Sequence, residues 1–151
     1  MTFVAGVDLG QAADYTAIVV TQVLDDHLDV RHIQRLPLGT PYPAQVSTIA
    51  GMMSTAPLGP STTVAVDATG VGRAVVDLLR PLPFRLLPVT ITGGASASRG
   101  AQGWHVPKRD LITATQVVLQ QGRLRIAAGL PMAKELITEL AAYRVSLASS
   151  S

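Results

Sequence analysis

Residues 3–10 read FVAGVDLG, a short apolar run that ends on Asp8 and is followed by a turn. Residues 63–70 read TVAVDATG and repeat this design around Asp67. A carboxylate at the exit of a buried strand loses hydration, so it needs a metal ion, a hydrogen-bond donor or a cation. If the two strands are adjacent and parallel, both carboxylates emerge at one sheet edge. There they predict an oxygen-rich site for Mg²⁺ or Mn²⁺.

Asp8 taken alone also fits a structural role, as a strand-end residue that caps the turn at Gly10. Asp67 favours the metal site, because two unpaired carboxylates would repel each other and raise the pKa of one of them. A bound divalent cation removes that cost.

Length and composition describe one compact domain. The chain has 151 residues, of which 48% are hydrophobic and 15% charged, and only six are aromatic. The core must therefore consist mainly of Val, Leu, Ile and Ala. The absence of cysteine excludes disulfides, zinc–thiolate sites and cysteine nucleophiles. No signal peptide and no apolar run of 18 residues is present, so we expect a cytoplasmic protein with no membrane partner.

Charge is unevenly distributed along the chain. Residues 1–60 carry two Arg against five Asp, whereas residues 61–151 carry ten Lys or Arg against five Asp or Glu. A basic second part is compatible with a polyanionic partner such as nucleic acid.

Hydrophobic periodicity predicts three antiparallel strands followed by βαβ units, which make a mixed sheet flanked by helices. Pro88 favours an edge position for its strand, and Thr69 is expected to N-cap a helix through Arg80. A Gly, Ala and Ser-rich stretch at 92–103 predicts a mobile loop. The expected strands are 3–8, 15–23, 28–36, 63–66 and 84–91, and residues 124–126 are expected to form a small strand or a turn. The expected helices are 44–55, 70–80, 107–121 and 131–143.

Four segments in this order carry a family resemblance. They read GVDLGQAADYTA at 6–17, VDATGVGR at 66–73, GWHVPKRDL at 103–111 and GRLRI at 122–126. The chain resembles the RNase H-like fold, and is most similar to the nuclease domain of phage terminase large subunits, over residues 3–147.

The resemblance implies a metal-dependent endonuclease that cuts double-stranded DNA during genome packaging, in a phage-infected or prophage-bearing bacterial host. In such chemistry two ions about 4 Å apart activate water and stabilise the leaving oxygen. By position Asp8 would bridge both metals, Mg²⁺ or Mn²⁺, and Asp67 would bind one of them. The implied partners are double-stranded DNA, the packaging ATPase domain and the portal.

The chain departs from this family in two respects. Terminase nucleases carry a third acidic residue just beyond the position where this chain stops, and the Gly-x-x-x-x-Gly-Lys-Ser/Thr motif of the ATPase does not occur. The chain is therefore either a fragment or a shortened phage-derived remnant, with a nuclease domain at 1–147 and a polar tail at 148–151. Glu135 and Glu139 are alternative third acids or ordinary solvated residues.

This departure leaves a second function open, a catalytically incomplete DNA-binding or assembly module. A resolvase on the same fold is a further alternative, although residues 67–72 fit terminases better.

The remaining polar residues have paired interpretations. Asp14 is expected in a turn and Asp110 at a helix start, where its charge complements the dipole. Trp104 either stacks on a base or anchors its loop. Five cations either form a phosphate-contacting rim beside the metal site or are solubilising charge, namely Arg99, Lys108, Arg109, Arg123 and Arg125.

Overall fold

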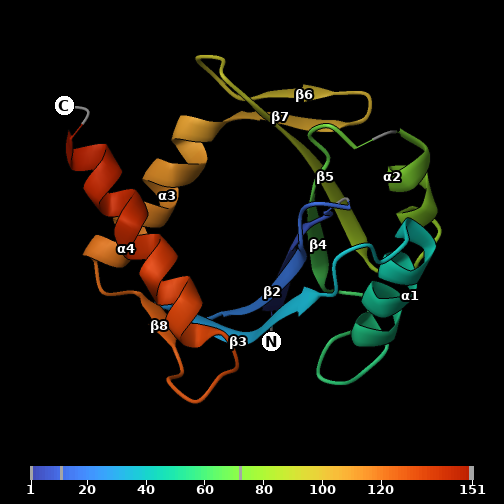
Figure 1. The fold of residues 1–151 in the computed structure, drawn as a ribbon, viewed down its shortest axis with the longest axis horizontal. Helices are drawn as coiled ribbons and strands as arrows, with labels where there is room; N and C mark the ends of the chain where they lie inside the picture. The colour runs from blue at the N-terminus through green and yellow to red at the C-terminus, as the bar shows by residue number, and fades with distance from the viewer. Residues whose placement is uncertain (1, 11, 72, 150–151) are drawn as a thin grey trace.

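The computed structural model describes residues 2–10, 12–71 and 73–149, which form one mixed sheet and four helices (Figure 1). Two residues of the quoted motifs lie outside the described residues, namely Gln11 and Gly72. So do residues 150–151 of the expected tail. The strands are β1 (Thr2–Asp8), β2 (Thr16–Val23), β3 (Leu28–Leu36), β4 (Thr63–Asp67), β5 (Arg85–Thr92), β6 (Ser98–Gly100), β7 (Gly103–Pro107) and β8 (Leu124–Ile126). The helices are α1 (Tyr42–Met53), α2 (Arg73–Leu79), α3 (Lys108–Gln120) and α4 (Ala133–Ser149).

The sheet has the strand order β6-β7-β5-β4-β1-β2-β3-β8. β1, β2 and β3 form the predicted antiparallel meander, and β1 also pairs with β4 in parallel. β4, β5 and β7 continue in parallel, while β6 returns antiparallel to β7. The predicted mixed sheet, with antiparallel strands first and parallel strands after, is confirmed. β1 lies in the interior of the sheet, between β4 and β2.

One face of the sheet holds the hydrophobic core. Alternate residues of β1 are buried, namely Phe3, Ala5 and Val7, because successive side chains of a strand point to opposite faces. α1 and α2 cover this face, to which they contribute Ile49, Met53 and Leu79.

The other face is covered more lightly. α3 and α4 stand on this side (Figure 1), and α3 buries none of its residues. Asp8 belongs to this face and is exposed. The carboxylate side of the sheet therefore stays open to solvent. No helix in the described part of the chain is long and apolar enough to cross a membrane.

The expected edge position of the Pro88 strand is wrong, since β5 lies between β4 and β7. Pro88 lies just before the first registered pair of β5 with β7, which joins Val89 to Trp104. A Cβ on Gly103, whose φ is +138°, would lie only 2.3 Å from the Pro88 carbonyl oxygen. Glycine thus lets the two backbones approach each other.

Three other expectations differ from the structure. Residues 92–103 are not one loop, because β6 and the start of β7 form a hairpin there. α2 begins at Arg73 and not after an N-cap at Thr69, whose hydroxyl accepts the Ile91 N–H instead (2.8 Å). The last helix extends to Ser149, so it includes part of the expected tail.

Leu79→Ala should lower the free energy of unfolding by about 2–5 kcal/mol, because it leaves a cavity between α2 and the sheet. Leu79 is fully buried, whereas Leu78, its neighbour in the same helix, is 44% exposed. Urea denaturation of both variants measures the difference. Equal effects of Leu79→Ala and Leu78→Ala would contradict this packing of α2.

Candidate metal centre at the ends of two parallel strands

Asp8 and Asp67 stand directly opposite each other at the ends of β1 and β4. The strands are parallel neighbours, so opposite residues project from the same face of the sheet, and adjacent strands are about 4.8 Å apart. Asp8 is exposed and Asp67 is half-buried. The two strands are adjacent and parallel, as the metal-site hypothesis requires. The two carboxylates therefore lie at the same edge of the sheet.

The electrostatics of this pair are unfavourable without a cation. The pKa of the Asp8 carboxyl is raised above its ordinary value of 3.8, first by loss of hydration and then by the negative charges of Asp67 and Asp14. Each of these causes penalises the ionised form, and a hard divalent cation reverses both charge effects. The donor set and its charge therefore fit Mg²⁺ or Mn²⁺.

The turn after Asp8 is held by hydrogen bonds to both backbone groups of one residue, Gly10. The Gly10 N–H donates to Thr16 Oγ1 (2.9 Å), and Gln45 Nε2 donates to the Gly10 carbonyl (3.2 Å) and to the Thr40 carbonyl (2.8 Å). Thr16 and Gln45 are each only 2% exposed. A hollow of about 420 Å³ opens beside this turn, between Gly10 and the loop at Thr40.

The turn after Asp67 is fixed by different contacts. Asp67 Oδ1 accepts the N–H of Thr69 (2.9 Å), and the Ala68 N–H donates to the Val89 carbonyl (2.8 Å). The Thr69 hydroxyl joins the same turn to β5. One oxygen of Asp67 is thus engaged by its own turn, and the carboxylate has a fixed direction.

Within the described residues, no third His, Cys, Asp or Glu joins this pair in a group that could hold a metal. Glu139 forms an ion pair with Arg35 across the sheet face (3.2 Å). Asp110 lies 3.9 Å from the Arg109 guanidinium, in the first turn of α3. Asp14 is close enough to raise the pKa of Asp8.

The five candidate DNA-binding cations fall into two groups. Lys108 and Arg109 directly follow β7, whose end lies at the same sheet edge as the ends of β1 and β4, and Arg99 is paired with Trp104. Arg123 and Arg125 lie at the opposite end of the sheet, because β8 pairs with the beginning of β3. The Arg123 side chain there donates to the Asp26 carbonyl (3.1 Å).

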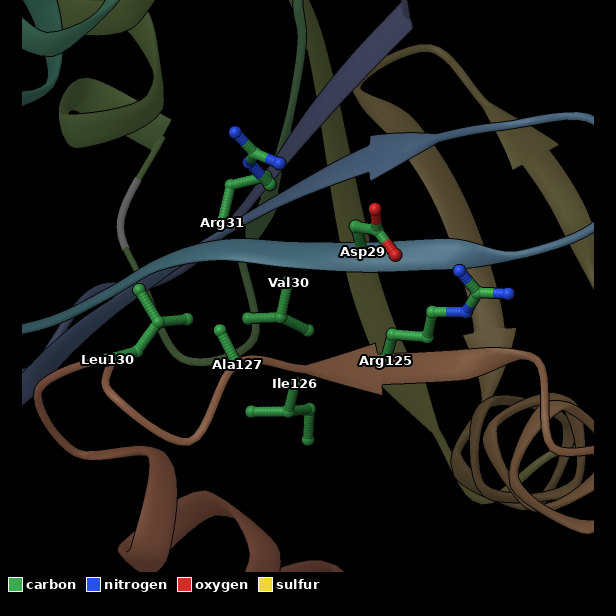
Figure 2. Close-up of a pocket in the computed structure, with 7 residues that line it drawn as sticks. All are labelled: Asp29, Val30, Arg31, Arg125, Ile126, Ala127 and Leu130. Carbon is green, nitrogen blue, oxygen red and sulfur yellow. The ribbon is translucent and has the colours of Figure 1, made fainter.

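A cavity of about 530 Å³ lies at that opposite end, between β3 and β8. Figure 2 shows Asp29 and Arg125 close together on these two strands, with Val30 above Ile126 beside them. This cavity is remote from Asp8 and does not belong to the same site.

Sequence reasoning missed the buried support of the first turn, Gln45 and Thr16. A glutamine among the apolar residues of a predicted helix is a weak signal, since its partners are 5 and 35 residues away in the chain. Thr16 lies within the first quoted motif, yet its hydroxyl contact to Gly10 requires the turn geometry.

Gly10→Ala should lower the free energy of unfolding by about 1–3 kcal/mol and weaken Mn²⁺ binding. A Cβ at this position would lie 2.2 Å from the Asp14 carbonyl oxygen, so the turn that follows Asp8 has to move. Thermal denaturation and calorimetric Mn²⁺ titration measure the two effects.

Gly51→Ala is the matched control, because nothing lies within 4 Å of its added methyl group in α1. It should stabilise the protein by about 0.5–1 kcal/mol and leave Mn²⁺ binding unchanged. A Gly10→Ala protein as stable as Gly51→Ala would contradict the tight turn.

Asp8→Asn should stabilise the metal-free protein at pH 7. The folded-state pKa of Asp8 is raised, so the protonated carboxyl stabilises the folded protein. This stabilisation is fully present below the ordinary pKa of 3.8 and is lost as the pH rises through the folded-state pKa. Denaturation in EDTA between pH 3 and pH 8 should show the gain of the variant growing with pH. A gain that is constant across this range would argue against the charge repulsion.

Comparisons with known proteins identify the fold. No family model matches the sequence, and no curated protein matches it. Among solved structures, the Mn-soaked, inhibitor-bound human cytomegalovirus terminase nuclease domain is similar with a TM-score of 0.61 and 12% identity, over 95% of this chain and 75% of that one. The large terminase nuclease of thermophilic phage G20c with bound zinc has a TM-score of 0.61 and 20% identity, over 89% of this chain and 68% of that one.

The P22 large terminase nuclease domain has a TM-score of 0.58 and 13% identity, over 92% of this chain and 66% of that one. The chain thus spans 66% to 75% of the length of these three structures. Their common architecture matches the mixed sheet and its helices. The chain has the RNase H-like fold of terminase nuclease domains.

Proposed function

We propose that this chain is a divalent metal-dependent endonuclease domain that cuts double-stranded DNA. The observation that carries the proposal is the pairing of Asp8 with Asp67 at the ends of two parallel strands. The fold shared with terminase nuclease domains supports it. Two carboxylates alone are a common arrangement, but here they occur at the central strands of a nuclease fold.

Asp8 and Asp67 would hold the metal, which is Mg²⁺ or Mn²⁺. The Mn-soaked cytomegalovirus nuclease and the zinc-bound G20c nuclease support a divalent ion. When bound, such an ion lowers the pKa of water and stabilises charge that develops on phosphate oxygens. The mutual repulsion of the two carboxylates is the reason why these residues are suited to bind it.

The residues around the carboxylates hold them in place. Gln45 and Thr16 fix the turn after Asp8, and Thr69 fixes one oxygen of Asp67. Metal ligands that are held by neighbouring hydrogen bonds bind with less loss of side-chain freedom. Lys108 and Arg109 follow β7 at the same edge, in a position to neutralise phosphate charge.

Genome packaging is the biological setting that the terminase likeness suggests. The packaging ATPase domain and the portal are the proposed partners in that setting, together with double-stranded DNA.

A second candidate function is a DNA-binding or assembly module that is catalytically incomplete. It is favoured by a specific observation, since the described residues offer two carboxylates and no third, and Glu139 is occupied by Arg35. This module would bind DNA and leave it intact.

Plasmid DNA incubated with the purified protein and Mn²⁺ separates the two functions. The endonuclease should convert supercoiled plasmid into nicked and linear forms, whereas Asp8→Ala and Asp67→Ala should reduce the rate to background because a metal ligand is lost. Agarose gel electrophoresis measures the conversion.

Asp25→Asn is the matched control, because it removes one carboxylate in the β2–β3 turn at the opposite end of the sheet and should cleave like the wild type. DNA binding without cleavage by the wild type would instead support the assembly module. Cleavage that survives in Asp8→Ala would point to a contaminating nuclease.

A further inference from the structure

The strand register places the two carboxylates in the middle of a longer row of aligned residues. Asp8 is opposite Asp67 on one side and Ala17 on the other, and Ala17 is opposite Arg35. In the other direction the register continues from Asp67 through Val89 to β7 and β6. This cross-strand row consists of Arg99, Trp104, Val89, Asp67, Asp8, Ala17 and Arg35.

Aligned residues of neighbouring strands share one face, so the row crosses the lightly covered side of the sheet. Arg35 is two strands from Asp8, which is about 10 Å at a strand spacing of about 4.8 Å. Arg99 is three strands from Asp67, about 14 Å by the same spacing. The carboxylates are thus flanked on both sides by an arginine.

Each of these arginines is accompanied by an exposed aromatic side chain. The Arg35 guanidinium lies over the Tyr15 ring, 5.2 Å from its centre, and Tyr15 keeps 49% of its surface in solvent. Trp104 is paired with Arg99 and is 38% exposed. Exposed Tyr and Trp rings at the two ends of an acidic centre offer flat π-faces on which a ligand can stack.

Arginine beside an exposed aromatic ring is suited to single-stranded nucleic acid. The guanidinium binds a backbone phosphate, and the ring stacks on an unpaired base, which every base allows because each has a π-face. Paired bases inside a duplex are already stacked and do not present this face.

We infer that the cross-strand row is a binding track for an unpaired DNA strand, with Tyr15 and Arg35 on one side of the metal site and Trp104 and Arg99 on the other. This inference rests on the proposed function for the position of the scissile phosphate, between the two pairs. The strand that is cut is held unstacked at the carboxylates, so the site favours DNA that is locally opened.

Glu139 restrains this track at one end. Its carboxylate forms the ion pair with Arg35 and so competes with a phosphate for the same guanidinium. Arg35 therefore has two states, one bound to α4 and one bound to DNA. Removal of the Glu139 charge should therefore strengthen DNA binding. If the ion pair only stabilised the fold, its loss would weaken DNA binding or leave it unchanged.

The test is fluorescence anisotropy in EDTA with a labelled single-stranded oligonucleotide and with its fully paired duplex. All variants are made in the Asp8→Asn background, which removes cleavage and one repelling charge. Binding is then measured independently of nuclease activity, so a failure of the proposed function leaves this readout intact.

Tyr15→Ala should weaken single-strand binding by roughly 5- to 100-fold, and duplex binding by much less, whereas Tyr15→Phe should retain the affinity of the Asp8→Asn parent. Arg35→Ala should weaken binding and lower the slope of log K against log salt by about one. Glu139→Gln should strengthen it several-fold. Arg85→Ala, at the beginning of β5 and away from the row, is the control and should have the smallest effect.

Unchanged single-strand affinity in Tyr15→Ala would overturn the inference. It would also be overturned if Arg85→Ala weakened binding as much as Arg35→Ala, because binding would then reflect overall charge. Equal losses on single-stranded and paired DNA would show that Tyr15 does not stack on an unpaired base.

Discussion

The parallel pairing of β1 with β4 is the constraint on which the rest of the molecule depends. It places two aspartates at the same edge of the sheet, where their negative charges repel each other. This repulsion and the loss of hydration raise the pKa of Asp8. The core is arranged to hold this pair, because the buried residues of both strands pack under α1 and α2 on the opposite face. Burial on one face thus stabilises an unfavourable charge arrangement on the other.

The support around the carboxylates comes from backbone groups and buried polar side chains. Gln45 donates to two carbonyls from a position that is almost fully buried, and its own Oε1 has no hydrogen-bond partner among the described residues. Leaving a buried acceptor unpaired is costly, so the contact to the Gly10 turn is maintained against a penalty. A buried polar side chain with one unpaired atom is typical of positions where function, and not stability, determines the residue.

The sequence predicts the parts of this architecture that depend on local pattern. β3 has the expected bounds, and the repeated strand–Asp–turn design anticipates the alignment of Asp8 with Asp67. The hairpin of β6 was not predictable from Gly, Ala and Ser, which have little strand propensity. The interior position of Pro88 was not predictable, because the close approach of the two backbones there depends on Gly103, a residue of another strand. The Arg35–Glu139 ion pair joins positions 104 residues apart, and no local pattern indicates it.

The central claim is that Asp8 and Asp67 share one metal ion site, and paramagnetic broadening by Mn²⁺ tests it most directly. Substoichiometric Mn²⁺ broadens only those amide NMR signals that are near the bound ion. The account predicts early loss of the signals of Asp8, Asp67 and Thr69, while the signals of Asp25 and Arg125 at the opposite end of the sheet persist. Broadening centred on the β2–β3 turn, or spread evenly over all acidic residues, would contradict it.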